Sequence, residues 1–182
     1  MKKIPTLFKR NPEDRRHVLN EVNHGCEWVL AGEGVATRKY DGTCVLLDAE
    51  GGWYARREVK RGKTAPACWY EVDRDDATGK SVGWEPIGGS PFVKFFDEAV
   101  TDLEGRRPGT YELIGPKVNG NPEGVGRHVL VPHADAEVMN EPTRDFDSLA
   151  EWLSQQPHEG VVWHHPDGRM VKLKKRDFPA TS

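Results

Sequence analysis

Short runs of alternating hydrophobic and polar residues occupy the first third of the chain, after a polar N-terminal stretch. From Cys26 to Glu58 these runs are rich in Val, Thr, Trp and Tyr, and Gly and Asp separate them. Runs of this kind between turn residues are typical of short β-strands. The pattern predicts strands at Cys26–Leu30, Val35–Lys39, Thr43–Asp48 and Trp53–Glu58, with a hairpin turn at 49–52.

Helical spacing of apolar residues occurs twice in the second half. The first set follows Pro91 at the spacing i, i+3, i+4 and i+8 and comprises Phe92, Phe95, Phe96 and Val100. This spacing predicts an amphipathic helix that packs one face on a sheet. A second helix is predicted to begin after Asp145 or Asp147 as its N-cap and to end before Pro157.

Three further strand signals lie around these helices. Strands are predicted at Gly109–Ile114 and Val129–Pro132, and a last hairpin pairs Gly160–His164 with Met170–Lys174. Many short strands with two or three helices, and without regular β-α-β alternation, predict an α+β fold built on antiparallel sheets. A doubly wound fold is disfavoured.

Two polar segments give weaker signals. Asn11 followed by Pro12 reads as an N-cap before the first helical position, so a short surface helix is expected up to Glu21. Residues 60–89 are polar and rich in Gly. We expect a mobile loop there, with at most one hairpin.

Length and composition indicate one intracellular globular domain. A chain of 182 residues is near the usual size of a single domain, and six Trp and six Phe are spread along it. Three Cys form no C-x-x-C pair, which argues against a disulfide framework and a four-ligand zinc site. No segment approaches the ~20 apolar residues that span a bilayer. We therefore expect a cytoplasmic protein without membrane contact.

Charge is unevenly distributed, although the formal net charge is only −3. That net charge gives no global attraction for nucleic acid, so any such binding depends on local basic patches. Basic residues gather near the two ends, at Lys2, Lys3, Lys9, Arg10, Arg15 and Arg16, and at Lys172, Lys174, Lys175 and Arg176.

The most informative tetrapeptide is Lys39-Tyr40-Asp41-Gly42, between two predicted strands. Residues i and i+2 of a strand share a face, so Lys39 and Asp41 are expected to point the same way. Gly42 lets the backbone turn closely around a ligand. The motif alone fits either a nucleophilic lysine or an exposed lysine beside a turn, and the rest of the chain must distinguish them.

Further charged residues follow at the ends of predicted strands. They are Arg57, Glu112, Glu159, Lys172 and Lys174. Taken with Lys39, their order and intervals resemble motifs I, III, IV and V of the covalent nucleotidyltransferases, the superfamily of ATP-dependent DNA and RNA ligases and mRNA capping enzymes. The resemblance covers about Gly34 to Lys174. Residues 112–122 followed by 128–133 look like the small RNA ligases of this superfamily.

This resemblance implies a fold, a reaction and its reactants. The fold would be an ATP-grasp-like nucleotidyltransferase domain over residues 1–182, without a C-terminal oligonucleotide-binding domain because only eight residues follow Lys174. The reaction would be RNA ligation through a lysyl-AMP intermediate, using ATP with Mg²⁺ or Mn²⁺. The substrate would be RNA with 5′-phosphate and 3′-OH ends, and the protein is expected to be a monomer.

The catalytic roles fall on three lysines. The resemblance makes Lys39 the nucleophile, and an amine attacks phosphorus only when unprotonated. Lys172 and Lys174 are two apart on a strand and point the same way, so they can crowd Lys39 with positive charge and hold the α-phosphate and departing pyrophosphate. Glu159 is expected to bind or orient the divalent metal.

The resemblance also implies a set of nucleotide-binding residues. Glu112 would accept the ribose hydroxyls, Arg57 or its neighbour Arg56 would hold a phosphate or sugar oxygen, and Val161 would pack on one side of adenine. The full set is Arg38, Asp41, Gly42, Arg57, Glu112, Val161, Lys172 and Lys174. The residue on the other side of adenine stays open, and His133 fits either that position or a structural one.

Two other functions fit the same residues. One is a GTP-using, capping-like transferase, and the other is a noncatalytic RNA-binding module on the same scaffold. RNA contacts in the ligase interpretation are expected at Lys60, Arg61, Lys63 and Lys117, which add positive charge near the motif residues.

Overall fold

The computed structural model describes residues 1–180 and divides into two compact units. The first unit comprises Met1–Lys3 and Asp41–Asp135, and the second comprises Ile4–Tyr40 and residues 136–180. Antiparallel sheets with helices confirm the α+β class. The single domain expected over residues 1–182 stays a prediction. Within residues 1–180, no helix has the length and apolar character needed to cross a membrane.

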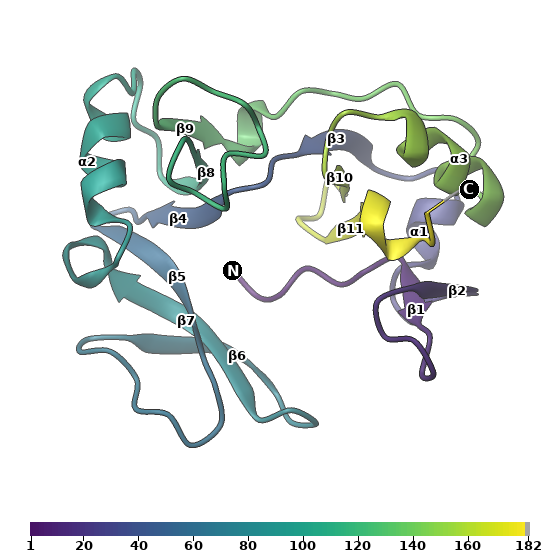
Figure 1. The fold of residues 1–182 in the computed structure, drawn as a ribbon, viewed down its shortest axis with the longest axis horizontal. Coiled ribbons are helices and arrows are strands. Elements are labelled where there is room, and N and C mark those ends of the chain that lie inside the picture. The colour runs from purple at the N-terminus through teal and green to yellow at the C-terminus, as the bar shows by residue number, and fades with distance from the viewer. Residues whose placement is uncertain (181–182) are drawn as a thin grey trace. The chain divides into compact units, whose positions relative to one another are not determined.

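The first unit is built on a six-stranded antiparallel sheet in the order β6-β7-β5-β4-β8-β9. Its strands are β4 (Thr43–Leu47), β5 (Trp53–Val59), β6 (Tyr70–Asp75), β7 (Lys80–Pro86), β8 (Gly109–Ile114) and β9 (Val129–Pro132). The helix α2 (Val93–Thr101) packs beside β9 (Figure 1). Its Phe96 and Ala99 are buried with Val45, Leu113 and other strand residues, so this core joins one sheet face to one helix face.

Two short 3₁₀ helices complete the first unit, η1 (Ile87–Gly89) and η2 (His133–Asp135). The second lies directly after β9 and contacts β8. It therefore places His133 beside the residues of β8.

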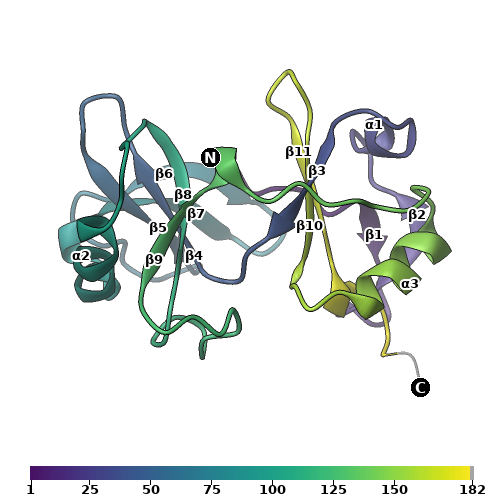
Figure 2. The ribbon, with the colours of Figure 1, turned by 90° about the horizontal axis from the view of Figure 1, so that it is seen from above.

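The second unit contains a three-stranded antiparallel sheet in the order β11-β10-β3 (Figure 2). Its elements are β1 (Phe8–Arg10), β2 (Val18–Val22), α1 (Glu27–Leu30), β3 (Val35–Lys39), α3 (Phe146–Gln155), β10 (Gly160–His164), β11 (Met170–Lys174) and η3 (Lys175–Asp177). Both sheet edges are covered, because Leu7 N donates to Lys172 O (2.9 Å) and Arg38 N donates to Glu137 O (2.7 Å). Unpaired strand edges are thereby avoided.

This three-stranded sheet has one apolar and one polar face. Alternate residues of a strand point to opposite faces. The buried residues of one face pack with α1, α3 and the β1–β2 hairpin in the core of the second unit, and they are Ala36, Val161, Trp163, Val171 and Leu173. The alternation places Lys39, Lys172 and Lys174 on the opposite face.

Most of the predicted elements are confirmed. The strand predicted at Val35–Lys39 and the final hairpin have the expected bounds, and the helix after Pro91 is α2. Asp145 caps α3, since its Oδ1 accepts a hydrogen bond from Ser148 N at 2.9 Å. Residues 60–89, expected to be a loop with one hairpin, contain the hairpin of β6 and β7, and β7 also pairs with β5.

Two predictions in the N-terminal region are wrong. Asn11 caps no helix. Its side chain accepts from Glu13 N in a local turn (3.0 Å), and residues 18–22 form strand β2 against β1. The run Cys26–Leu30 is not a strand but contains the helical turn α1. The adjacent residues Trp28 and Val29 are both buried. In a strand with one exposed face, one of two adjacent side chains would point to solvent, whereas a helical turn within the core can bury both.

The packing around Gly160 gives a testable prediction. A Cβ at Gly160 would lie 2.2 Å from Leu173 O and 2.8 Å from Lys174 Cα, both backbone atoms. Gly160→Ala should therefore force β10 and β11 apart and lower the free energy of unfolding by about 1–3 kcal/mol. The control is Gly126→Ala, since that glycine has open space around it and no positive φ. Urea denaturation measures both, and equal stabilities would contradict the predicted clash.

Candidate active site

A carboxylate between two ammonium groups forms the centre of the second unit's polar sheet face. Lys39 Nζ lies 2.6 Å from Glu159 Oε2, and Lys174 Nζ lies 3.0 Å from Glu159 Oε1. The three side chains are between 11% and 19% exposed. Arg176 Nη2 is 3.9 Å from the same Oε1. Glu159 is thus in ion-pair range of three cations.

The strand register explains this arrangement. Gly160 on the central strand is the Cα partner of Lys39 on one side and of Lys174 on the other. Strands β3 and β11 lie on either side of β10, so the backbones at Lys39 and Lys174 are about 9–10 Å apart. Gly160 has no side chain to fill the gap between the two lysines. The carboxylate of the preceding residue, Glu159, occupies that gap and accepts from Lys39.

The electrostatics of Glu159 follow from this geometry. Burial by itself raises the pKa of the Glu159 carboxyl, but the charges of Lys39 and Lys174, with the hydrogen bonds that they donate, outweigh it and lower the pKa below its ordinary value. Glu159 is therefore a carboxylate at neutral pH. The charged group in contact with Lys39 is this carboxylate, whereas the sequence predicted crowding by Lys172 and Lys174.

Lys172 lies on the same face, two residue pairs further along β11 from Lys174. Its Cα partner is Val162, which in turn pairs with Thr37 on β3. Lys39, Lys172 and Lys174 therefore share a face, as the two-residue spacing of the lysine pair predicted.

Val161 is on the other face of the same strand. It is fully buried in the core of the second unit, which leaves its side chain no surface for a nucleotide. The aliphatic side chain that β10 presents between Thr37 and Lys172 is Val162, at 8% exposed. The strand register therefore turns Val162, and not Val161, towards the lysines, and the adenine contact expected at Val161 stays a prediction.

Arg38 also lies away from Lys39. Adjacent residues of β3 point to opposite faces. The Arg38 guanidinium lies over the Tyr40 ring, 4.5 Å from its centroid, and Nη1 is 3.5 Å from Glu137 Oε2. A nucleotide contact by Arg38 stays a prediction.

Asp41 and Gly42 begin the second part of the first unit. Asp41 was expected to point the same way as Lys39 through strand alternation. The strand β3 ends at Lys39, so alternation does not fix the direction of the Asp41 side chain. Its Oδ1 accepts from Asn119 Nδ2 at 3.0 Å, and its N donates to Glu123 Oε1 at 2.7 Å. A Cβ at Gly42 would lie 2.2 Å from Leu113 O, so glycine is required here by the close approach of β8.

Glu112 is held from two sides within the first unit. Its Oε1 accepts from Gly42 N at 3.1 Å, and its Oε2 is 2.8 Å from His133 Nε2. The other ring nitrogen of His133 is hydrogen-bonded to Thr110 Oγ1 at 2.8 Å. His133 therefore orients Glu112. Sequence spacing does not reveal this role, because it depends on the contact between β8 and η2.

A possible ligand group for a metal includes the same two residues. One atom each from Cys44, Glu112 and His133 lie within 4.8 Å of one another. Thiol and imidazole donors suit zinc better than magnesium, which prefers oxygen. The binding of Mg²⁺ or Mn²⁺ by the carboxylate of Glu159 stays a prediction. Cys44 was not among the expected site residues, since only the register Cys44↔Glu112 brings it there.

Arg57 is directed by a buried acid. Arg57 Nη1 is 3.6 Å from Glu85 Oε1, and the Glu85 side chain is 2% exposed while that of Arg57 is 42% exposed. Arg56 is adjacent on β5 and so points to the opposite face. The structure thus gives Arg57 a fixed orientation with an accessible side chain, and its phosphate or sugar contact stays a prediction.

Comparison of the sequence with known proteins places this chain in a family. A model of the RNA ligase 1 family matches residues 67–179. RNA ligase 1 of Rattus norvegicus is 39% identical over 78% of this chain and 66% of the rat protein, and the Mus musculus protein of that name is 39% identical over 78% of this chain and 65% of its own length. RNA ligase 1 of Danio rerio is 40% identical over 36% of this chain and 23% of that protein.

The chain thus spans no more than about two thirds of the length of these relatives. The family model nevertheless covers well over half of this chain, including β10, β11 and Glu159. On that match, the chain belongs to the RNA ligase 1 family.

Proposed function

We propose that this chain is an ATP-dependent RNA ligase that forms a lysyl-AMP intermediate on Lys39. The observation that supports this most directly is the contact of Glu159 with both Lys39 and Lys174 on one face of the β3-β10-β11 sheet. Membership of the RNA ligase 1 family supports RNA as the substrate. The order of the motif residues supports ATP and the covalent intermediate.

In the first step, Lys39 Nζ attacks the α-phosphorus of ATP. A P–N bond forms, the bond from the α-phosphorus to the bridging oxygen breaks, and pyrophosphate leaves with that electron pair. The proton that the nitrogen loses as the P–N bond forms passes to solvent. The attacking amine must be unprotonated, so the Lys39–Glu159 ion pair has to open before the bond forms. Lys174 and Lys172 are on the same face and can hold phosphate oxygens whose charge increases during the transfer.

Two further in-line transfers complete ligation. An oxygen of the RNA 5′-phosphate attacks the lysyl-AMP phosphorus, the P–N bond breaks, and Lys39 regains its electron pair and a proton. A 3′-hydroxyl then attacks the 5′-phosphorus of the adenylated RNA, its proton passes to solvent, and AMP leaves as the phosphodiester bond forms.

The carboxylates of Glu159 and Glu112 would have different roles, metal binding and ribose binding. Glu159 would hold Mg²⁺ or Mn²⁺, and a carboxylate with water and phosphate oxygens is a common ligand set for Mg²⁺. When bound, the metal supplies charge neutralisation for the triphosphate. Glu112 is held by Gly42 N and His133 and would accept hydrogen bonds from the ribose hydroxyls.

Lys39→Ala tests the covalent step. Intact mass after incubation with ATP and Mg²⁺ should show one added AMP on the unsubstituted protein and none on Lys39→Ala, and a peptide map should locate the AMP on Lys39. Lys9→Ala is the matched control, because Lys9 is 51% exposed in the same unit and its ion-pair partner is Glu21. The adduct should survive in that variant.

The result also separates the ligase from its alternatives. Label from GTP but not ATP on Lys39 would support a capping-like transferase instead. No adduct on correctly folded unsubstituted protein with either nucleotide would contradict the proposal and leave a noncatalytic RNA-binding module.

Glu159→Gln tests the ion-pair cluster through pH. The folded-state pKa of Glu159 lies below the ordinary 4.5, so its contribution to stability is present above pH 4.5 and is lost as pH falls through the folded-state value. The variant should be less stable at pH 7 by on the order of 3 kcal/mol, the cost of removing one partner from a largely buried pair. The difference should shrink as the pH is lowered below 4.5 and through the folded-state pKa.

Urea denaturation across this pH range measures the difference. Glu151→Gln is the control, since Glu151 is exposed on α3 in the same unit. A Glu159→Gln difference that stayed constant with pH would show that the carboxylate charge does not stabilise this unit.

A further inference from the structure

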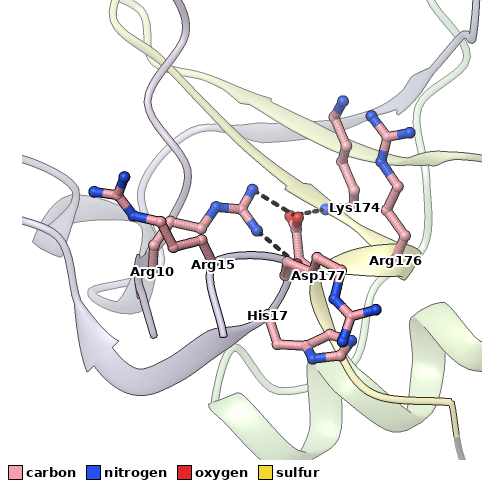
Figure 3. Close-up of a pocket in the computed structure, with 7 residues that line it drawn as sticks. Arg10, Arg15, His17, Lys174, Arg176 and Asp177 are labelled. Carbon is pink, nitrogen blue, oxygen red and sulfur yellow. Dashed lines mark hydrogen bonds and ion pairs between the residues drawn. The ribbon is translucent and has the colours of Figure 1, made fainter. Parts of the chain in front are cut away.

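A basic pocket in the second unit includes Lys174, one of the two lysines that contact Glu159 (Figure 3). Its volume is about 520 Å³, and it lies where the turn between β1 and β2 meets the end of β11 and η3. The residues that line it are Arg10, Arg15, Arg16, His17, Lys174, Arg176 and Asp177. We call it the η3 pocket.

The η3 pocket has a surplus of positive charge. Five of its residues are Lys or Arg and one is Asp, so the lining carries a formal +4 with His17 neutral. Adding Asp14 and Glu159, which pair with these cations, still leaves +2. The whole chain has a net charge of −3. Concentrated positive charge in a hollow of an acidic protein indicates an anionic ligand.

The pocket wall is fixed before any ligand binds. Asp177 is 1% exposed, accepts from Lys174 N at 2.8 Å and pairs with Arg10 Nη2 at 2.7 Å. Arg10 Nη1 also donates to Arg16 O at 3.1 Å, which ties the β1–β2 turn to η3. Asp14 orders the same turn, and the hydrogen bond from Arg16 lowers the pKa of Asp14 to about 2. A preorganised wall reduces the entropic cost of binding.

Two cations of the pocket remain available to a ligand. Within residues 1–180, Arg15 has no carboxylate at ion-pair distance. Arg176 is 73% exposed and reaches Glu159 only at 3.9 Å. Figure 3 shows the Arg176 and Lys174 side chains pointing the same way from the end of the hairpin. Guanidinium groups with free N–H donors suit phosphate, which they can hold through two hydrogen bonds at once.

The pocket is connected to the proposed reaction by shared residues. Lys174 lines the pocket and contacts Glu159, and Glu159 in turn contacts Lys39. In an in-line transfer, the attacking RNA phosphate must approach lysyl-AMP close to these groups. Arg15, Arg16 and Arg176 are exposed at the rim, so a ligand can continue beyond the pocket as a polynucleotide does and ATP does not.

We propose that the η3 pocket binds the 5′-phosphorylated end of the RNA strand, with Arg15 and Arg176 as phosphate-binding residues. This assignment rests on the proposed ligase function for the identity of the strand, but phosphate binding by the pocket can be measured without catalysis.

The first experiment measures binding alone. Fluorescence anisotropy compares one oligoribonucleotide with a 5′-phosphate and the same sequence with a 5′-hydroxyl, using protein without bound AMP. The unsubstituted protein and Lys39→Ala should both prefer the 5′-phosphate, while Arg15→Ala and Arg176→Ala should lose about tenfold in affinity for it and little for the 5′-hydroxyl strand. This result is informative even if no lysyl-AMP forms.

The control variant removes an arginine of the same unit that lies outside the η3 pocket. Arg169 precedes β11 at its other end, five residues and about 17 Å from Lys174. Arg169→Ala should keep the preference for the 5′-phosphate. Equal preference in Arg15→Ala, Arg176→Ala and the unsubstituted protein would overturn the assignment. Far-UV circular dichroism checks that Arg15→Ala and Arg176→Ala are folded.

The second experiment separates RNA from ATP as the source of the phosphate. Single-turnover rates are measured for lysyl-AMP formation and, with isolated lysyl-AMP protein, for AMP transfer to 5′-phosphorylated RNA. Arg15→Ala and Arg176→Ala should slow the transfer at limiting RNA at least tenfold more than they slow lysyl-AMP formation. Equal losses in both steps, or a loss confined to lysyl-AMP formation, would assign the pocket to the phosphates of ATP and overturn the RNA assignment.

Discussion

The ion pairs of Glu159 with Lys39 and Lys174 hold the polar face of the second unit together. Two ammonium groups that are this poorly exposed repel each other unless an anion lies between them, and desolvation adds to the cost. Because Gly160 has no side chain, the Glu159 carboxylate can reach both lysines across the central strand. A single acidic residue thus gives the lysines fixed positions in the nucleotide-free protein.

The same cluster is adapted to give way to a ligand. A phosphate group can replace the Glu159 carboxylate as the anion that faces Lys39 and Lys174, since both are oxygen acceptors for ammonium donors. In the proposed ligase, the carboxylate released in this way becomes available to a divalent metal. The resting ion pairs therefore keep the site ordered without a ligand, and in the proposed ligase they would open as ATP binds.

The two faces of the β3-β10-β11 sheet separate stability from chemistry. The buried residues of the inner face are apolar and pack with α1 and α3, while the outer face carries the lysines. The turn of the β1–β2 hairpin and η3 then add the arginines of the η3 pocket at the end of β11. In the first unit, β4 and β8 bring Gly42 and Glu112 together in the same manner, through strand pairing.

Alternation of side chains made much of this arrangement readable from the sequence. The strands around Lys39, Glu112 and Lys172 and the helix α2 follow from local patterns, and the shared face of Lys172 and Lys174 follows from their spacing. The helical turn at Trp28 was missed, because burial by the rest of the core overrides the strand propensity of a short run.

Sequence by itself determined which donor and acceptor groups lie on which strand faces, since these follow from residue type and strand spacing. Tertiary structure alone decided which of them meet. Strand register put Gly160 between Lys39 and Lys174 and turned Val162 instead of Val161 towards the lysines. Contacts between distant segments placed His133 on Glu112 and Arg10 on Asp177. Such pairings depend on how strands align across long loops, which local sequence does not encode.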